Sequence, residues 1–125
     1  MIAHFSDSLG HFAAFENFLA SSPSVFSRRF KEARKRAGMT QEQVAVRAGI
    51  DEFSASARVS QYETGKHVPS YGIARNLAKA MKVPVEFLYT ADDRTAELLL
   101  CWFTLDLSQR TALLTDIRSR LAAGD

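Results

Sequence analysis

The sequence predicts an all-α protein: a five-helix domain with a helical arm before it and a pair of helices after it. Three observations lead to this prediction. Apolar residues recur three or four positions apart in several short segments, which is the spacing of one helix face. A Ser, Thr or Asp stands before most of these segments and a glycine follows several of them, as helix caps do. With 125 residues, 46% of them apolar, the chain can bury one core.

Residues 1–27 are expected to form an N-terminal extension that contains five of the nine phenylalanines. A short amphipathic helix is predicted from about Leu9 to Ala20, before a Ser-Ser-Pro sequence that would end it. The side chains that approximate one helical face are Leu9, Phe12, Phe15, Phe18 and Leu19. Two interpretations remain open: an arm that binds a partner or braces a dimer, or an addition from an upstream start codon.

Residues 28–90 are expected to form the domain itself. Its first helix is predicted from about Arg28 to Ala37, because Gly38 can take the left-handed conformation that ends a helix without steric cost. The positions expected to be buried are Phe30, Ala33 and Ala37.

The next helix should begin at Gln41. Thr40 followed by Gln43 fits a capping box, in which each side chain satisfies a backbone amide of the first turn. The inward face is expected to carry Val44, Ala45 and Ala48, and Gly49 should end this helix.

A second short helix follows, and its inward face is expected to carry Val59 and Tyr62. The residues left facing outward or sideways are Ser56, Ala57, Arg58, Ser60 and Gln61. Two short helices that meet at a glycine corner have the layout of a helix-turn-helix. Arginine suits guanine O6 and N7, and glutamine suits adenine N6 and N7, so this outward face is suited to the edges of bases.

The stretch FKEARKRAGMTQEQVAVRAGI, followed by VSQYETGKHVPS and IARNLAKAMKVPVEFL, resembles the helix-turn-helix domain of the phage Cro and cI repressor type, also called the xenobiotic response element (XRE) family. The likeness covers roughly residues 30–88, from the first helix of that domain to its fifth. It implies a lambda-repressor-like fold and sequence-specific binding to double-stranded DNA, in the role of a bacterial or phage-type transcriptional regulator, typically a repressor.

The chain departs from this family between the two helices. Gly49 and Val59 are separated by nine residues, about four more than the family usually has, and four residues are about one helical turn. Either the second helix begins a turn early with Asp51 as its cap, or the connection is a longer loop with Ser54 as the cap. We favour the longer loop, because Phe53 could then tuck under it while Asp51 and Glu52 stay away from phosphate.

The resemblance also implies a structural ion pair between Arg34 and Glu63, at the end of the second helix. The outer edge of such a pair would reach a phosphate. Other phosphate contacts are expected at the start of the preceding helix and in the loop after the second helix. The residues expected to contact phosphate are Thr40, Gln41, Arg34, Thr64 and Lys66.

Two further helices should complete the domain. Gly65 and Pro69 keep the segment after Glu63 as a loop, and Ser70 should cap a helix from about Tyr71 to Met81. Pro84 opens a final short helix. The apolar residues expected to face the core are Ile73, Leu77, Met81, Val85, Phe87 and Leu88.

Residues 91–125 are expected to add a helical pair, one helix capped by Asp92 and the other by Ser108. Two helices cannot bury all of their own apolar surface, so they must pack on something. One possibility is packing back on the domain; the favoured one is a homodimer, since such regulators read two-fold symmetric operators. The residues expected at this dimer interface are Leu98, Trp102, Leu105, Leu113, Ile117 and Leu121, with Trp102 as the anchor.

Charge is distributed unevenly along the chain. The formal net charge is only +2. Residues 28–82 hold 12 Lys and Arg against 5 Asp and Glu, a net of +7, whereas the remaining residues hold 4 against 9, a net of −5. A basic block that coincides with the helix-turn-helix is what displacement of counterions from DNA requires.

Other kinds of site find no support in the sequence. Cys101 is a single cysteine, expected to be a small buried residue, and His4, His11 and His67 lack metal-ligand spacing. No catalytic constellation appears, so neither an enzyme nor a cofactor or metal is expected. No signal peptide or membrane-spanning stretch is recognisable, and a cytoplasmic protein is expected.

The sequence therefore predicts a DNA-binding regulator. The competing interpretation is an antitoxin or other protein-interaction module that uses the same fold, because extensions at both ends of the domain could bind a partner protein.

Overall fold

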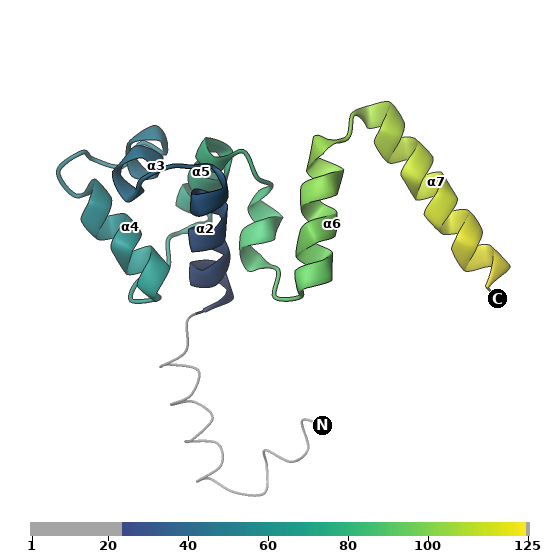
Figure 1. The fold of residues 1–125 in the computed structure, drawn as a ribbon, viewed down its shortest axis with the longest axis horizontal. Helices are drawn as coiled ribbons and strands as arrows, with labels where there is room; N and C mark the ends of the chain where they lie inside the picture. The colour runs from purple at the N-terminus through teal and green to yellow at the C-terminus, as the bar shows by residue number, and fades with distance from the viewer. Residues whose placement is uncertain (1–23, 125) are drawn as a thin grey trace, which may run out of the picture.

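The computed structural model describes residues 24–124, which form helices joined by loops (Figure 1). In chain order these are α2 (Val25–Arg36), α3 (Gln41–Arg47), α4 (Ala55–Thr64), α5 (Tyr71–Met81), the 3₁₀ helix η2 (Val85–Tyr89), α6 (Asp93–Thr104) and α7 (Leu107–Ala123). The all-α prediction is confirmed. The helix expected over Leu9–Ala20 lies outside the described residues.

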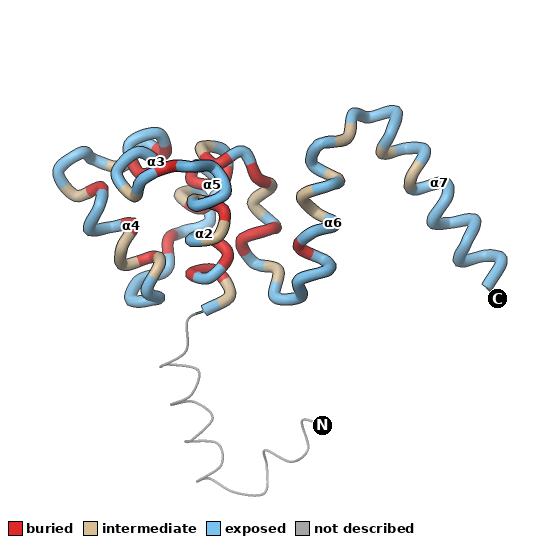
Figure 2. Tube along the Cα trace, viewed as in Figure 1, coloured by how far each residue is buried: buried red, intermediate tan, exposed pale blue. Residues whose placement is uncertain are grey.

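Helices α2 to α5 and η2 surround one apolar core (Figure 2). The largest side chains that are fully buried there come from every one of these elements: Phe30, Val44, Val59, Leu77, Phe87 and Leu88. Helix α4 packs on α3 and α2, and α5 packs on α3 and η2. The orientation of α4 is therefore set by its packing on α2 and α3, with which it shares the core.

Helix α2 begins three residues earlier than the sequence predicted. The Ser24 hydroxyl accepts a hydrogen bond from the Ser27 amide at 3.1 Å, so the cap lies before Val25. This brings Phe26 into the core, where its ring lies 5.7 Å from that of Phe30. The prediction that Ala37 is buried was wrong, because Ala37 is the exposed C-cap residue from which the chain turns through Gly38.

Helix α3 follows the sequence prediction closely. Thr40 and Gln43 form the predicted capping box, with a 3.1 Å bond from the Gln43 amide to the Thr40 hydroxyl and a 2.9 Å bond from the Thr40 amide to the Gln43 side chain. Val44, Ala45 and Ala48 are buried. Gly49 ends the turn with φ of +87°, the left-handed conformation that glycine adopts most easily.

The four additional residues form a longer loop before α4, the favoured alternative. Ser54 is the N-cap residue, as predicted, but its side chain makes no capping bond and its hydroxyl donates instead to the Asp51 carbonyl oxygen at 3.3 Å. Phe53 does not tuck under the loop, since its side chain is 99% exposed. The domain core is already filled by Val44, Ala55 and Val59, which are fully buried.

Helix α5 and η2 complete the domain as expected. The Ser70 hydroxyl accepts from the Ile73 amide at 3.3 Å, and Leu77 and Met81 are buried, while Ile73 is half-buried. Pro84 stands before η2, whose Phe87 and Leu88 enter the core.

The C-terminal helices pack much less. Asp92 caps α6 as predicted, through a 2.9 Å bond from the Thr95 amide, and Ala96 is the buried residue of α6. The prediction that Ser108 caps α7 was wrong. Asp106 and Gln109 form a reciprocal capping box at 2.8 and 2.9 Å, and this box starts the helix two residues earlier.

Helix α7 has no buried residue within the described part of the chain, and it projects away from the domain (Figure 1). The prediction that Cys101 is buried was also wrong, because α6 contacts the domain along one side and Cys101 lies on an exposed position of that helix.

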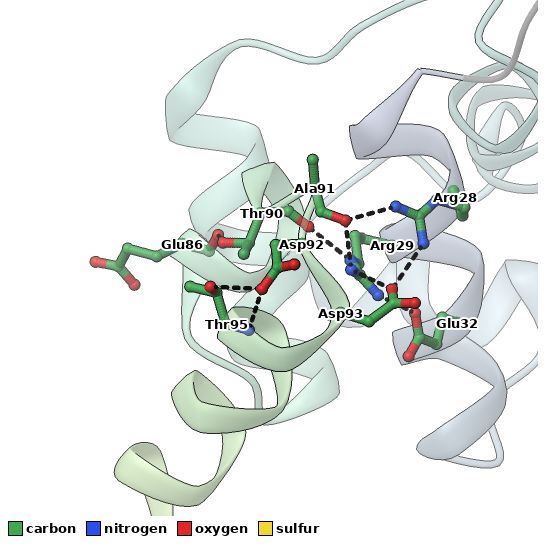
Figure 3. Close-up of polar contacts among 9 residues, drawn as sticks. All are labelled: Arg28, Arg29, Glu32, Glu86, Thr90, Ala91, Asp92, Asp93 and Thr95. Carbon is green, nitrogen blue, oxygen red and sulfur yellow. Dashed lines mark hydrogen bonds and ion pairs between the residues drawn. The ribbon is translucent and has the colours of Figure 1, made fainter.

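A buried arginine attaches α6 to α2 (Figure 3). The Arg29 side chain is 3% exposed, and its Nε donates to the Thr90 carbonyl oxygen at 2.7 Å. Its Nη2 donates to the Ala91 carbonyl oxygen at 3.0 Å and to Asp93 Oδ1 at 2.8 Å. Its guanidinium also lies over the Phe87 ring, 5.5 Å from the centroid. These bonds fix where α6 starts relative to the domain.

The ionisation of this cluster follows from its contacts. Burial lowers the pKa of Arg29, but the hydrogen bonds to Asp93 and Glu32 outweigh it and the net shift is upward. The same hydrogen bond from Arg29 lowers the pKa of Asp93, with a smaller contribution from Arg28. Both shifts favour the charged forms of Arg29 and Asp93, so the ion pair between them is stabilised at neutral pH.

None of the helices in residues 24–124 combines the length and the apolar character that crossing a membrane requires.

Candidate nucleic-acid interface

The outward face of α4 is set by three buried anchors, Ala55, Val59 and Tyr62. Because these residues face the core, the helix cannot rotate without exposing them. Of the side chains that the sequence assigned to base reading, Ser56, Ala57 and Arg58 are exposed, and Ser60 and Gln61 are half-buried. The helix therefore presents a small polar face with one cation and one carboxamide.

Arg34 and Glu63 lie together at the C-terminal end of α4. Arg34 Nε donates to Glu63 Oε2, and Arg34 Nη2 donates to Glu63 Oε1 at 3.1 Å, which makes the pair bidentate. The side chains of Arg34 and Glu63 are only 14% and 5% exposed. A buried, bidentate pair of this kind joins α2 to α4 and holds its geometry firmly.

Two further hydrogen bonds connect the Arg34–Glu63 pair to neighbouring residues. Arg34 Nη1 donates to the Met39 carbonyl oxygen at 2.9 Å, and Gln41 Nε2 donates to Glu63 Oε1 at 3.3 Å. The start of α3 is therefore tied to the end of α4. Because these donors already have partners, Arg34 and Gln41 have less capacity for phosphate than the sequence alone suggests.

Thr40 and Thr64 are likewise engaged locally. The Thr40 hydroxyl accepts the cap bond from Gln43, and the Thr64 hydroxyl donates to the Gln61 carbonyl oxygen at 3.3 Å. Lys66, in contrast, is exposed in the loop that begins at Gly65, where φ is +79°.

A hollow of about 460 Å³ lies between α4 and the loop that follows it. Arg58 and Gln61 line it from α4, His67 and Pro69 line it from the loop, and Ser70 lines it at the cap of α5. The loop is held against the helix by a 3.2 Å bond from the His67 amide to the Gln61 carbonyl oxygen. Two of the five base-reading candidates, Arg58 and Gln61, therefore line the same hollow.

Basic residues that the sequence analysis did not assign lie near this surface. Arg75 and Lys79 on α5 line a hollow with Ser70, Gly72, Ile73 and Asn76. Arg47 and Lys82 line a neighbouring one with Lys79. The positive block in the sequence contained these residues, and the four-residue spacing of Arg75 and Lys79 on one helix face was the signal that could have singled them out.

The residues expected at a dimer interface lie on α6 and α7. Leu98, Ile117 and Leu121 are exposed, and Trp102, Leu105 and Leu113 are half-buried. Trp102 is the least free of them, because Arg110 lies over its ring at 5.4 Å and Arg110 Nε donates to its carbonyl oxygen at 3.0 Å.

Comparisons with known proteins give matches to a family model and to solved structures. A model of the helix-turn-helix domain family matches residues 25–87. Among solved structures, the crystal structure of the transcriptional regulator BswR is similar to this chain at 40% sequence identity and a TM-score of 0.74. That match covers 79% of this chain and 98% of the other. The comparison with curated proteins gave no match.

Proposed function

Since this chain belongs to the helix-turn-helix family, in its XRE-like type, and is a DNA-binding transcription regulator, we propose that it acts as a homodimeric repressor that reads a two-fold symmetric operator with α4. Its place of action would be the cytoplasm, where the DNA is. The observation that carries the proposal is the exposed polar face of α4, held by buried anchors beside exposed basic residues.

Base readout is assigned to the middle of α4. Arg58 is the candidate for guanine O6 and N7, and Gln61 for adenine N6 and N7. Ser56 and Ser60 would read either bases or phosphate, and Ala57 is small enough to approach a thymine methyl group. Because Ser60 and Gln61 are half-buried, Arg58 would supply most of the discrimination.

Phosphate contacts are assigned around this helix and would set its register. Lys66 is the leading candidate, because it is exposed in the loop that directly follows α4. Thr64, Thr40 and Gln41 would contribute secondarily, and Arg34 through the outer edge of its pair with Glu63.

Dimerisation is assigned to α6 and α7. Helix α7 has no buried residue in the described chain, and its exposed Ile117 and Leu121 need an apolar partner. A dimer formed there would present two copies of α4 about 34 Å apart, one turn of duplex.

Two substitutions test base reading against phosphate contact. Arg58→Ala should cost about 1 to 3 kcal/mol on the operator and relax preference at one base position. Lys66→Ala should weaken operator and random DNA alike and reduce the salt slope by about one unit. Fluorescence anisotropy at several salt concentrations measures both, with Lys31→Ala as an exposed control on α2. An equal loss on both DNAs for Arg58→Ala would refute its reading role.

A second candidate function is an antitoxin or other protein-interaction module. The apolar surface of α7 favours it, because the same face that would bind a second copy could bind a different protein. Mass measurement of the protein purified with its neighbouring gene product distinguishes the two, since a stoichiometric heteromeric complex favours the module and a homodimer favours the repressor.

A further inference from the structure

A further hollow lies where α5, η2 and α6 meet, and it shares Arg75 and Lys79 with the hollow beside Ser70 and Asn76. Its volume is about 680 Å³. Small-molecule sites commonly enclose about 300 to 1,000 Å³ and combine apolar walls with a few polar groups. This hollow is large enough for an aromatic compound of ordinary metabolite size.

Aromatic side chains line the hollow from two helices. Tyr71 stands at the start of α5, and Trp102 and Phe103 stand near the end of α6, with Leu99 one turn before them. Trp102 and Leu99 are half-buried, so each has one covered side and one side open to the hollow. Aromatic surfaces of this kind bind flat apolar groups by stacking or edge contacts.

The charged groups of the hollow are mostly cations. Arg75 and Lys79 line it from α5, and Arg110 lines it from the start of α7, against Glu86 as the one carboxylate among the lining residues. Cations from two separate elements that line one hollow together with aromatic side chains favour a ligand carrying negative charge.

Arg110 has a special place in this hollow. Its Nε donates to the Trp102 carbonyl oxygen at 3.0 Å and its Nη2 to the Phe103 carbonyl oxygen at 3.3 Å. These bonds cap the end of α6 and set the junction between α6 and α7. A guanidinium has five N–H donors, so donors remain on its outer edge for an acid.

We propose that this hollow is a binding site for a small aromatic acid, whose ring contacts Trp102 and Phe103 and whose carboxylate or sulfonate is held by Arg75, Lys79 and Arg110. An acid bound to the outer edge of Arg110 shares this guanidinium with the carbonyl groups at the end of α6, so binding is coupled to the α6–α7 junction. A consequence of this coupling for dimer geometry rests on the proposed function; the binding itself does not, and it is tested without DNA.

The test uses 1-anilinonaphthalene-8-sulfonate as the acidic probe and N-phenyl-1-naphthylamine as its uncharged counterpart. Trp102 is the only tryptophan of the chain, so its indole N–H gives a single resonance in a nitrogen-correlation spectrum of the full-length protein. The sulfonate should shift that resonance and bind at least about tenfold more tightly than the uncharged probe, since hydrogen bonds to charged groups are the strong ones.

Two matched double variants separate the hollow from general charge. Arg75→Ala with Lys79→Ala should weaken sulfonate binding about tenfold or more. Arg94→Ala with Arg118→Ala removes the same charge from exposed positions of α6 and α7 outside the hollow, and binding should stay within about twofold of the unmodified protein.

Four results would overturn the proposal. Equal affinity for the two probes would mean that the hollow has no preference for an acid. Equal losses of affinity in the two double variants would mean that Arg75 and Lys79 have no specific role in binding. A Trp102 resonance that stays fixed while resonances of α7 shift would put the probe on the exposed apolar face instead. Probe binding that vanishes as the protein dimerises would assign the hollow to the second copy.

Discussion

Apolar side chains are buried in the domain formed by α2 to η2, whereas most of those on the helix pair α6 and α7 are not. The domain buries Phe30, Leu77 and Phe87 completely around one core. In the described part of the C-terminal pair, Ala96 is the one buried residue, whereas Leu98, Leu114 and Leu121 are exposed. Burial of apolar area is the main stabilising term in folding, so the domain stabilises itself and the pair has surface left for another molecule.

The largest effect on the free energy of unfolding is expected for a substitution in the domain core. Phe30→Ala should lower the free energy of unfolding by about 3 to 5 kcal/mol, because it removes a fully buried ring and leaves a cavity. Leu121→Ala on α7, a side chain that is 67% exposed, should cost less than about 0.5 kcal/mol in dilute protein. Urea unfolding followed by circular dichroism measures both. Similar costs would mean that α7 belongs to the same core.

The next effect concerns the ion pair between Arg34 and Glu63, which joins α2 to α4. Glu63→Gln should cost about 3 kcal/mol, because it leaves Arg34 buried without its counter-charge. Glu42→Gln, at an exposed position in the first turn of α3, is the control and should stay within about 0.5 kcal/mol. Thermal and urea unfolding report both variants. If Glu63→Gln behaves like its control, the pair contributes nothing to the position of α4.

The next prediction concerns the dimer interface that we propose on α7. Ile117→Asp should raise the dimer dissociation constant by roughly 10- to 100-fold, since it replaces an apolar side chain worth about 1.5 to 3 kcal/mol when buried. Val46→Asp makes the same change at an exposed position of the domain and should leave the dimer unchanged. Sedimentation over a concentration series measures the constant. An unchanged dimer in Ile117→Asp would refute the interface assigned to α7.

The smallest effect lies at the joint between the two regions. The hydrogen bond from Arg29 lowers the pKa of Asp93, so its stabilisation is complete above the ordinary carboxyl pKa of about 3.9 and is lost as the pH falls through the lowered value. Asp93→Asn cannot ionise and should show a shallower loss of stability below about pH 4. Because Asp93 is 84% exposed, the difference should be small. Urea midpoints of both proteins at pH 7, 4 and 3 measure this difference. If stability falls equally with pH in the two proteins, the prediction is contradicted.

Local signals in the sequence predicted the domain well. Thr40 with Gln43, Ser70 and Asp92 were each recognised as caps, because capping depends on a few neighbouring residues and every one of these bonds forms. The likeness to the Cro and cI type supplied the fold of the whole domain, and the matched family model confirms it.

The wrong predictions have a common origin: the sequence allowed two placements for each residue, and contacts in the folded chain select one of them. Asp106 and Ser108 could both cap α7, and the reciprocal bonds with Gln109 favour Asp106. Phe53 was expected to tuck under the loop before α4 but is 99% exposed, and Cys101 was expected to be buried but lies at an exposed position of α6. The contacts of Gln41 with Glu63 join residues 22 positions apart, a distance that no local pattern reports.

The most direct test of the central claim is selection of bound sequences from random double-stranded DNA, run in parallel for the unmodified chain and for Ile117→Asp. If α4 reads bases and α6 with α7 pairs two copies, the unmodified chain will select a palindrome with half-sites one helical turn apart. The Ile117→Asp variant will then select a single half-site with weaker affinity. Sequences without a shared motif from the unmodified chain would contradict the claim.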